Sequence, residues 1–242
     1  MTRRRFPVGK TLLYGFMSLW ALTTIYPFIW VILNSFKPRG LIRSDTFSLP
    51  IGDKFTLENY VTAFKRVDIG TAYVNSIVIS GAVTVVVMVL AGLAAYAMVR
   101  YSFRLRGFLH SMIIASMMFP VFSTIIPVFR MESSWGIVNT GSIWLTRLSV
   151  VLPQIAGNLS FAIIVLMGFI RSLPVDLEEA AYLEGYNVYQ IFFRIIMPLA
   201  KPSFATVGIF TFLWSYNDLF LQMFFLRSKK FFTITRLLNE IS

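Results

Sequence analysis

Charged side chains are unevenly spread along this chain and leave five long apolar windows. The windows are residues 11–36, 69–99, 107–129, 148–170 and 202–226. Each is longer than the roughly 20 residues that a helix needs to cross the hydrocarbon core of a bilayer. Within lipid, backbone groups must hydrogen-bond inside their own segment, so the pattern predicts five transmembrane helices.

Composition supports the same interpretation. Hydrophobic residues make up 57% of the chain and charged residues 14%, against about 45–50% and about 25% in soluble proteins. We therefore predict an all-α integral membrane protein, a polytopic helical bundle over residues 11–226 with a tail at each end.

The net charge of +11 does not indicate nucleic-acid binding, because the basic residues lie in the connections between windows. There they meet lipid head groups and set orientation. A basic tail over residues 1–10 and an arginine-rich loop after the second window favour a cytoplasmic N-terminus, although the total count of Lys and Arg does not favour that side. The loop arginines are Arg100, Arg104 and Arg106. Residues 227–242 then form an outer-side amphipathic tail, with Phe231, Ile234, Leu238 and Ile241 at helical spacing.

The chain contains no chemistry that predicts an enzyme. It has no cysteine, and His110 is its only histidine, so we expect no metal site and no cofactor in this chain. The stretch Gly9-Lys10-Thr11 ends like a phosphate-binding loop. Arg4 stands where that motif needs its first glycine, and a membrane span follows it.

The connection 171–201 is the longest segment on the predicted cytoplasmic side. We expect two short helices here, the first capped by Asp176 with Glu179 and ended by Gly185. Asn187 would cap the second helix and Pro198 would stop it. On periodicity alone, an ordinary amphipathic loop on the membrane surface is an equally good interpretation.

The spacing of this connection resembles the signature loop of ABC-importer permeases. Glu179-Ala180-Ala181 is followed after three residues by Gly185, and after nine more by Ile195-Ile196-Met197-Pro198; Met197 replaces the usual leucine. Further matching stretches are Tyr26-Pro27-Phe28-Ile29-Trp30, Asn75-Ser76, Leu93-Ala94-Ala95-Tyr96-Ala97 and Tyr216-Asn217-Asp218. In this order they resemble the smaller permease subunit of the maltose-type carbohydrate-uptake family.

The resemblance implies a permease subunit of an ATP-driven sugar importer in the bacterial plasma (inner) membrane. Its implied partners are a second homologous permease in a heterodimer, two ATPase subunits that bind ATP and Mg²⁺, and an extracytoplasmic sugar-binding protein. The implied ATPase-coupling residues are Glu178, Glu179, Ala180, Ala181, Leu183, Gly185, Ile195 and Pro198. Such permeases usually have a sixth span, so we expect that the sequence lacks one through truncation.

Asp218 is the one carboxylate within the five windows. A charge at membrane depth costs about 2.5–3.5 kcal/mol on insertion scales, so we expect it to face the bundle interior or water. It would line a substrate path with Asn217 and Gln222, or contribute to an outer gate. Alternatively it forms an interhelical hydrogen bond; the candidate partners are Asn158, Ser160 and Asn75.

Other functions remain open at this point. The solute could be another small polar compound, such as a polyol, a glycerol phosphate or a polyamine. A secondary transporter or channel subunit is a further alternative. It would need coupling carboxylates within the spans or a filter sequence, and Asp218 alone is a poor match.

Overall fold

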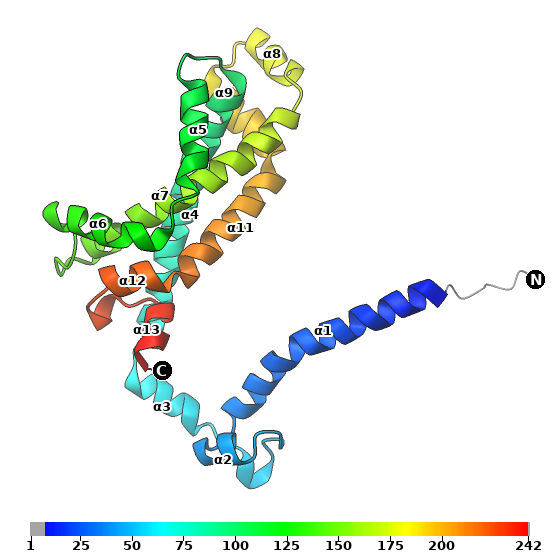
Figure 1. Ribbon diagram of the computed structural model, residues 1–242, viewed down its shortest axis with the longest axis vertical. Helices are drawn as coiled ribbons and strands as arrows, with labels where there is room; N and C mark the ends of the chain where they lie inside the picture. Colours follow the sequence, from blue (N-terminus) through cyan, green and yellow to red (C-terminus); the bar gives the residue numbers. More distant parts are fainter. Residues whose placement is uncertain (1–7, 242) are drawn as a thin grey trace, which may run out of the picture. The chain divides into compact units, whose positions relative to one another are not determined.

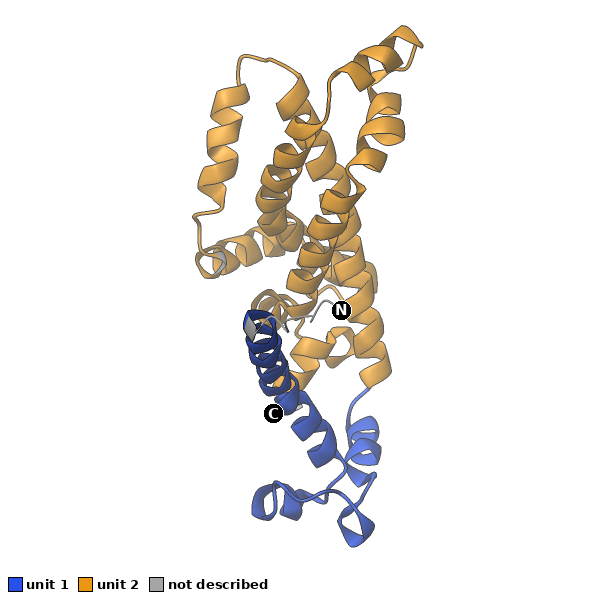
Figure 2. Ribbon diagram, turned by 90° about the vertical axis from the view of Figure 1, so that its right-hand side faces the viewer, with its two compact units in different colours: residues 1–68 blue, residues 69–242 orange. Residues whose placement is uncertain are grey.

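The computed structural model describes residues 8–241. Most of the predicted basic tail, with Arg3, Arg4 and Arg5, lies outside this range. The chain divides into two compact units, residues 1–68 and residues 69–242 (Figure 2). The described residues contain helices and turns and no strand, so the all-α prediction is confirmed for them.

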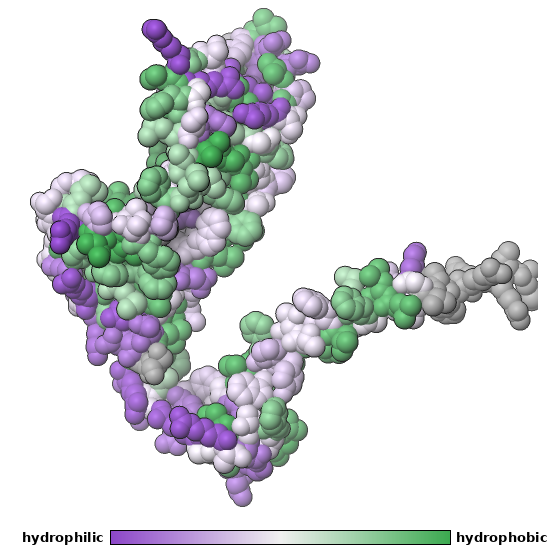
Figure 3. Space-filling view, in the orientation of Figure 1, coloured by the Kyte–Doolittle hydropathy of each residue, from purple (hydrophilic) through white to green (hydrophobic). Residues whose placement is uncertain are grey.

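Unit 1 begins with one long helix, α1 (Val8–Ser35). Its side chains are exposed along most of its length and predominantly apolar (Figure 3). From Gly9 to Ser35 it is long and apolar enough to cross a membrane. The predicted span over 11–36 is therefore a single helix. Three short elements follow: α2 (Arg39–Ser44), η1 (Gly52–Lys54) and α3 (Glu58–Arg66).

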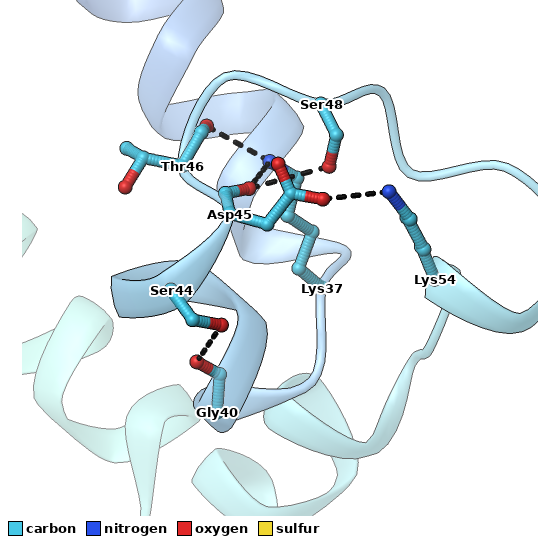
Figure 4. A network of polar contacts seen from close by, with 7 residues as sticks. All are labelled: Lys37, Gly40, Ser44, Asp45, Thr46, Ser48 and Lys54. Atoms are coloured by element: carbon cyan, nitrogen blue, oxygen red, sulfur yellow. Dashed lines mark hydrogen bonds and ion pairs between the residues drawn. The ribbon is translucent and has the colours of Figure 1, made fainter.

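A buried lysine organises the connection after α1 (Figure 4). Lys37 is 0% exposed, and its Nζ donates to the carbonyl oxygens of Asp45 at 3.0 Å and Thr46 at 2.9 Å. The Lys54 ammonium lies 2.6 Å from the Asp45 carboxylate and holds the pKa of that carboxyl below its ordinary value. Hydrogen bonds to backbone carbonyls thus satisfy a buried charge that would otherwise be costly.

Unit 2 is built on α4 (Ile69–Arg100), which packs against α7 (Ile143–Ser172) and α11 (Lys201–Asn217). Their shared core contains buried aliphatic and aromatic side chains, among them Val83, Val87, Ala91, Leu166 and Phe204. The remaining elements are α5 (Arg106–Ser116), α6 (Val121–Ser134), α8 (Asp176–Leu183), α9 (Val188–Ile191), the π-helical turn η2 (Phe192–Ile196), α10 (Met197–Leu199), α12 (Leu219–Phe225), η3 (Lys229–Phe231) and α13 (Ile234–Ile241). Within this unit, α8 lies at one end and α12 and α13 at the other (Figure 1).

Two of the five predicted spans are each divided between two helices. The windows 69–99 and 148–170 fall within α4 and α7, both long and apolar enough to cross a membrane. The window 107–129, in which Pro120 and Pro127 predict a kink or an interruption, is divided between α5 and α6, because Pro120 lacks the N–H that a continuous helix needs. The window 202–226 is divided between α11 and α12, where Asp218 ends one helix and caps the next.

The helix after Asn187 also continues further than we predict from the sequence. Pro198 does not stop it, because Pro198 stands in the first turn of α10, where a missing N–H is tolerated. The chain bends by 82° between 188–199 and 201–217. The break therefore lies at Ala200.

The C-terminal tail is not a free interfacial helix. Phe231, Phe232, Ile234 and Leu237 are buried, whereas Leu238 is exposed. Unit 2 thus buries much of the apolar face of the predicted amphipathic tail, because α4 offers both an apolar surface and polar partners for the backbone of 230–234. Ser242 lies outside the described residues.

Candidate functional site

The helix α8 carries the predicted coupling residues on two different faces. Glu179 and Ala180 are exposed, and Leu183 is 90% exposed. Glu178 and Ala181 are buried against the rest of unit 2. Beyond α8, Ile195 is half-buried and Pro198 exposed. On the face shown in Figure 3, polar side chains gather around this end of the unit.

The turn after α8 follows the predicted chemistry. Gly185 has a φ of 86°, a left-handed conformation that favours glycine and ends the helix. The Asn187 side chain accepts from the Gln190 N–H at 2.9 Å, and the Gln190 side chain accepts from the Asn187 N–H at 2.8 Å. This is a capping box. The first predicted cap is wrong: Asp176 is the first residue of α8, and Val175 precedes it without a side-chain cap.

Glu178 makes contacts that its neighbour Glu179 does not. Its carboxylate accepts from Arg100 Nε at 2.5 Å and from the Tyr96 hydroxyl at 2.7 Å. Arg100 also donates to the carbonyl oxygen of Leu173 at 2.9 Å. α8 is thereby attached to the end of α4. Among the described residues, the Glu179 side chain forms no ion pair or hydrogen bond, so its carboxylate is available at the surface.

A cavity of about 350 Å³ lies nearer the other end of unit 2. Side chains from α6, α7, α11 and α12, together with Asp218 between the last two, line it: Phe122, Pro153, Gln154, Gly157, Asn158, Trp214, Asp218, Phe220 and Leu221. The rings of Phe122 and Phe220 meet edge to face, with centroids 4.6 Å apart. Apolar walls with a few fixed polar groups are typical of small-molecule sites.

Asp218 connects two helices at this cavity. Its Oδ1 accepts from the Leu221 N–H at 3.1 Å and caps α12, while its Oδ2 accepts from Gln154 Nε2 at 3.1 Å. Gln154 is 2% exposed, and its side-chain Oε1 accepts from the Ser215 hydroxyl at 2.5 Å. An interhelical hydrogen bond is therefore present, but its partner is Gln154 and not one of the three residues that we predict from the sequence.

The other two predicted pathway residues do not line this cavity. Asn217 is exposed, and its amide donates to the Leu213 carbonyl of its own helix at 2.8 Å. Gln222 is buried; it donates to the Ser215 carbonyl at 3.1 Å and accepts from the Thr233 hydroxyl. Gln222 thus connects α12 to the C-terminal segment. That Asp218 belongs to a substrate path remains a prediction.

Several residues at the cavity and at the end of α4 were not predicted from the sequence as site residues. Gln154 is polar within the apolar window 148–170, and this was a usable signal. Trp214, Phe122 and Phe220 gave no such signal, because aromatic residues are frequent throughout the chain and common at lipid interfaces. Arg100 stood out only as a loop charge.

Comparisons with known proteins agree with these features. Residues 87–241 match the family described as "Binding-protein-dependent transport system inner membrane component". The diacetylchitobiose uptake system permease protein NgcG of Streptomyces coelicolor is 35% identical over 210 residues, which cover 87% of this chain and 67% of that relative. The trehalose transport system permease protein SugB of Mycobacterium tuberculosis is 32% identical, covering 89% of this chain and 73% of that relative.

A solved structure shows the same fold. A chain of a bacterial ABC transporter involved in the import of the acidic polysaccharide alginate superposes with a TM-score of 0.82 at 22% identity, over 99% of this chain and 82% of that chain. The matched family segment includes the second part of α4 from residue 87 onward, the whole of α8 and the cavity. This chain belongs to the family of inner membrane components of binding-protein-dependent transport systems, the permease subunits of ABC importers.

Proposed function

We propose that this chain forms half of the translocation path of an importer for a sugar or oligosaccharide, and that α8 docks on a separate ATPase subunit. The observation that carries the proposal is the exposed surface of α8. Glu179, Ala180 and Leu183 face outward from a short helix that unit 2 holds at its other face. Small side chains allow close approach, and an exposed carboxylate can pair with a cation on the partner.

The sugar assignment rests on the cavity and on the relatives. Diacetylchitobiose and trehalose, named for two relatives, are both neutral and rich in hydroxyl groups. The cavity offers groups suited to such a solute: Trp214 and Phe220 provide ring faces, and Asp218 and Asn158 can hydrogen-bond to hydroxyls. Its volume of about 350 Å³ lies within the range of about 300–1,000 Å³ for small-molecule sites.

The remaining parts of the assembly follow from the same proposal. The α8 end of unit 2 and the N-terminus face the cytoplasm, in keeping with Arg100, Arg104 and Arg106 near that end. A second permease completes the path as a heterodimer, and an extracytoplasmic binding protein delivers the solute. ATP and Mg²⁺ bind to the ATPase subunits. This chain binds neither.

Copurification and reconstituted transport test the proposal. Tagged protein expressed with its neighbouring genes should copurify with an ATPase and a second permease. The copurified complex, reconstituted in proteoliposomes with its binding protein, should take up labelled trehalose or diacetylchitobiose when ATP is supplied. A non-hydrolysable ATP analogue should not support this uptake. Uptake driven by an ion gradient without ATP would contradict the proposal. So would preparations that contain no nucleotide-hydrolysing subunit.

A further inference from the structure

The ion pair between Glu178 and Arg100 is buried on both sides. The exposed fractions of the two side chains are 5% and 11%, and Nε lies 2.5 Å from the carboxylate. The Tyr96 hydroxyl donates to the other carboxylate oxygen at 2.7 Å. Both oxygens of Glu178 therefore have partners on α4. A residue that met the ATPase directly would present its carboxylate at the surface, as Glu179 does.

Aromatic side chains add further contacts around this ion pair. Near the C-terminal end of α8, the Tyr182 hydroxyl lies 3.0 Å from that of Tyr101, one residue past α4. Burial, followed by the hydrogen bond with Tyr182, raises the pKa of Tyr101. The ring of Tyr96 packs on Tyr101 and on Phe192 in η2, at centroid distances of 6.0 and 5.6 Å. The cluster thus joins three elements that are distant in sequence.

We infer that Glu178 is a positioning residue: through Arg100 and Tyr96 it holds α8 on the end of α4, so that both helices move as one body during transport. This inference rests on the proposed function, because it assumes that the ATPase moves α8. It assigns Glu178 a role different from that of Glu179. Glu179 belongs to the docking surface, and Glu178 transmits the movement of that surface into the bundle.

Because α8 is attached to α4, a movement of α8 can reach the far end of unit 2. α4 is 32 residues long and packs against both α7 and α11. Near its other end, Asn75 and Ser76 bind the backbone of 230–234. Movement imposed on α8 therefore reaches the opposite end of unit 2 along one continuous helix, in addition to the path through α9, α10 and the bend at Ala200.

Paired substitutions separate this role from a merely structural one. Removing one partner of a buried ion pair leaves an uncompensated charge, whereas replacing both is often neutral for stability. Glu178→Gln and Arg100→Met should each lower the melting temperature, and the double variant should recover it. If the pair transmits movement, the double variant should still transport about tenfold less solute per ATP hydrolysed. Recovery of normal coupling in the stable double variant would overturn the inference.

A tether provides the second measurement. The chain contains no cysteine, so Tyr101→Cys and Tyr182→Cys place thiols that a short bis-maleimide can join. If α8 and α4 move together, the tethered protein should transport as well as the untethered one. The tether should also restore coupling to the Glu178→Gln/Arg100→Met variant. Transport blocked by the tether would show that the contact must open, and would contradict the inference.

A matched control keeps the two proposals distinguishable. Glu184→Gln removes an exposed carboxylate just past the same helix and should leave both stability and coupling unchanged. If the Glu178→Gln/Arg100→Met variant couples normally and the parent protein copurifies with an active ATPase, the inference is wrong and the proposed function stands. The proposed function fails if the parent itself has no such companion.

Discussion

The side-chain amide of Asn75, near the start of α4, donates a hydrogen bond of 3.0 Å to the carbonyl oxygen of Phe232, 157 residues later in the chain. Asn75 is 1% exposed. Its amide also donates to the Lys230 carbonyl at 3.3 Å, and its oxygen accepts from Arg147 Nη2 at 2.8 Å. One side chain thereby joins α4, α7 and the C-terminal segment.

Asn75→Ala should loosen that segment. The substitution leaves buried backbone carbonyls without a donor, which costs about 1–3 kcal/mol. Trypsin should then cleave after Lys230 faster than in the parent protein, as measured on a gel over time. Val74→Ala, at an exposed neighbouring position, serves as the control. An unchanged cleavage rate for Asn75→Ala would show that the apolar contacts alone hold the segment.

Gly185→Val should uncouple ATP hydrolysis from transport. The residue has a φ of 86°, and a β-branched side chain in that conformation costs about 1–3 kcal/mol of strain. The turn after α8 would shift and displace the docking surface, while the membrane helices stay folded. We expect normal membrane insertion with a loss of solute-stimulated ATPase activity.

The same change at Gly107 is the control for Gly185→Val. A Cβ there meets no atom within 4 Å, and its φ is not left-handed. Gly107→Val should retain full stimulation. Equal stimulation in both variants would count against the coupling role of the turn.

Two substitutions at Asp218 distinguish its role as the N-cap of α12 from the role of its negative charge. Asparagine is also a good N-cap, so Asp218→Asn should keep α12 stable; Asp218→Ala should cost about 0.5–2 kcal/mol of stability. Asp218→Asn lacks the second carboxylate oxygen, which accepts from Gln154. This hydrogen bond to a charged group, which contributes about 1.5–3 kcal/mol, fixes the carboxylate at the cavity; given the proposed role of the cavity as the solute site, we expect uptake to fall about tenfold or more. Wild-type uptake by this variant would exclude a charge-dependent role in the pathway.

Gly92→Ala should disturb the packing of α4. The added Cβ would lie 2.8 Å from Phe204 Cζ and 3.0 Å from Phe192 Cζ, and both rings are buried. Such overpacking costs about 1–3 kcal/mol, so the melting temperature in detergent should fall. Gly81→Ala, which meets no atom within 4 Å, should not lower it. Phe204→Leu in the Gly92→Ala background should recover part of the lost melting temperature. An unchanged melting temperature for Gly92→Ala would show that this close contact does not limit stability.

Part of this architecture could be predicted from local sequence. Long uncharged windows predict membrane helices because lipid leaves the backbone no other partner. Gly185 and the Asn187 cap were predictable because each acts on residues within one helical turn. The break at Pro120 was predictable because a proline removes a backbone donor, whereas the break at Asp218 was hidden within an apolar window, because length and hydropathy carry no information on bending.

The direction of neighbouring side chains was decided by the tertiary structure. Glu178 and Glu179 are adjacent on one helix and point about 100° apart, so one faces the bundle and the other the surface. Sequence alone does not say which, because the partner Arg100 is 78 residues away. Asp218 finds Gln154 across a separation of 64 residues. The sequence thus determined where helices form and turn, and packing determined which charges are paired, because pairing depends on distances that only the folded chain sets.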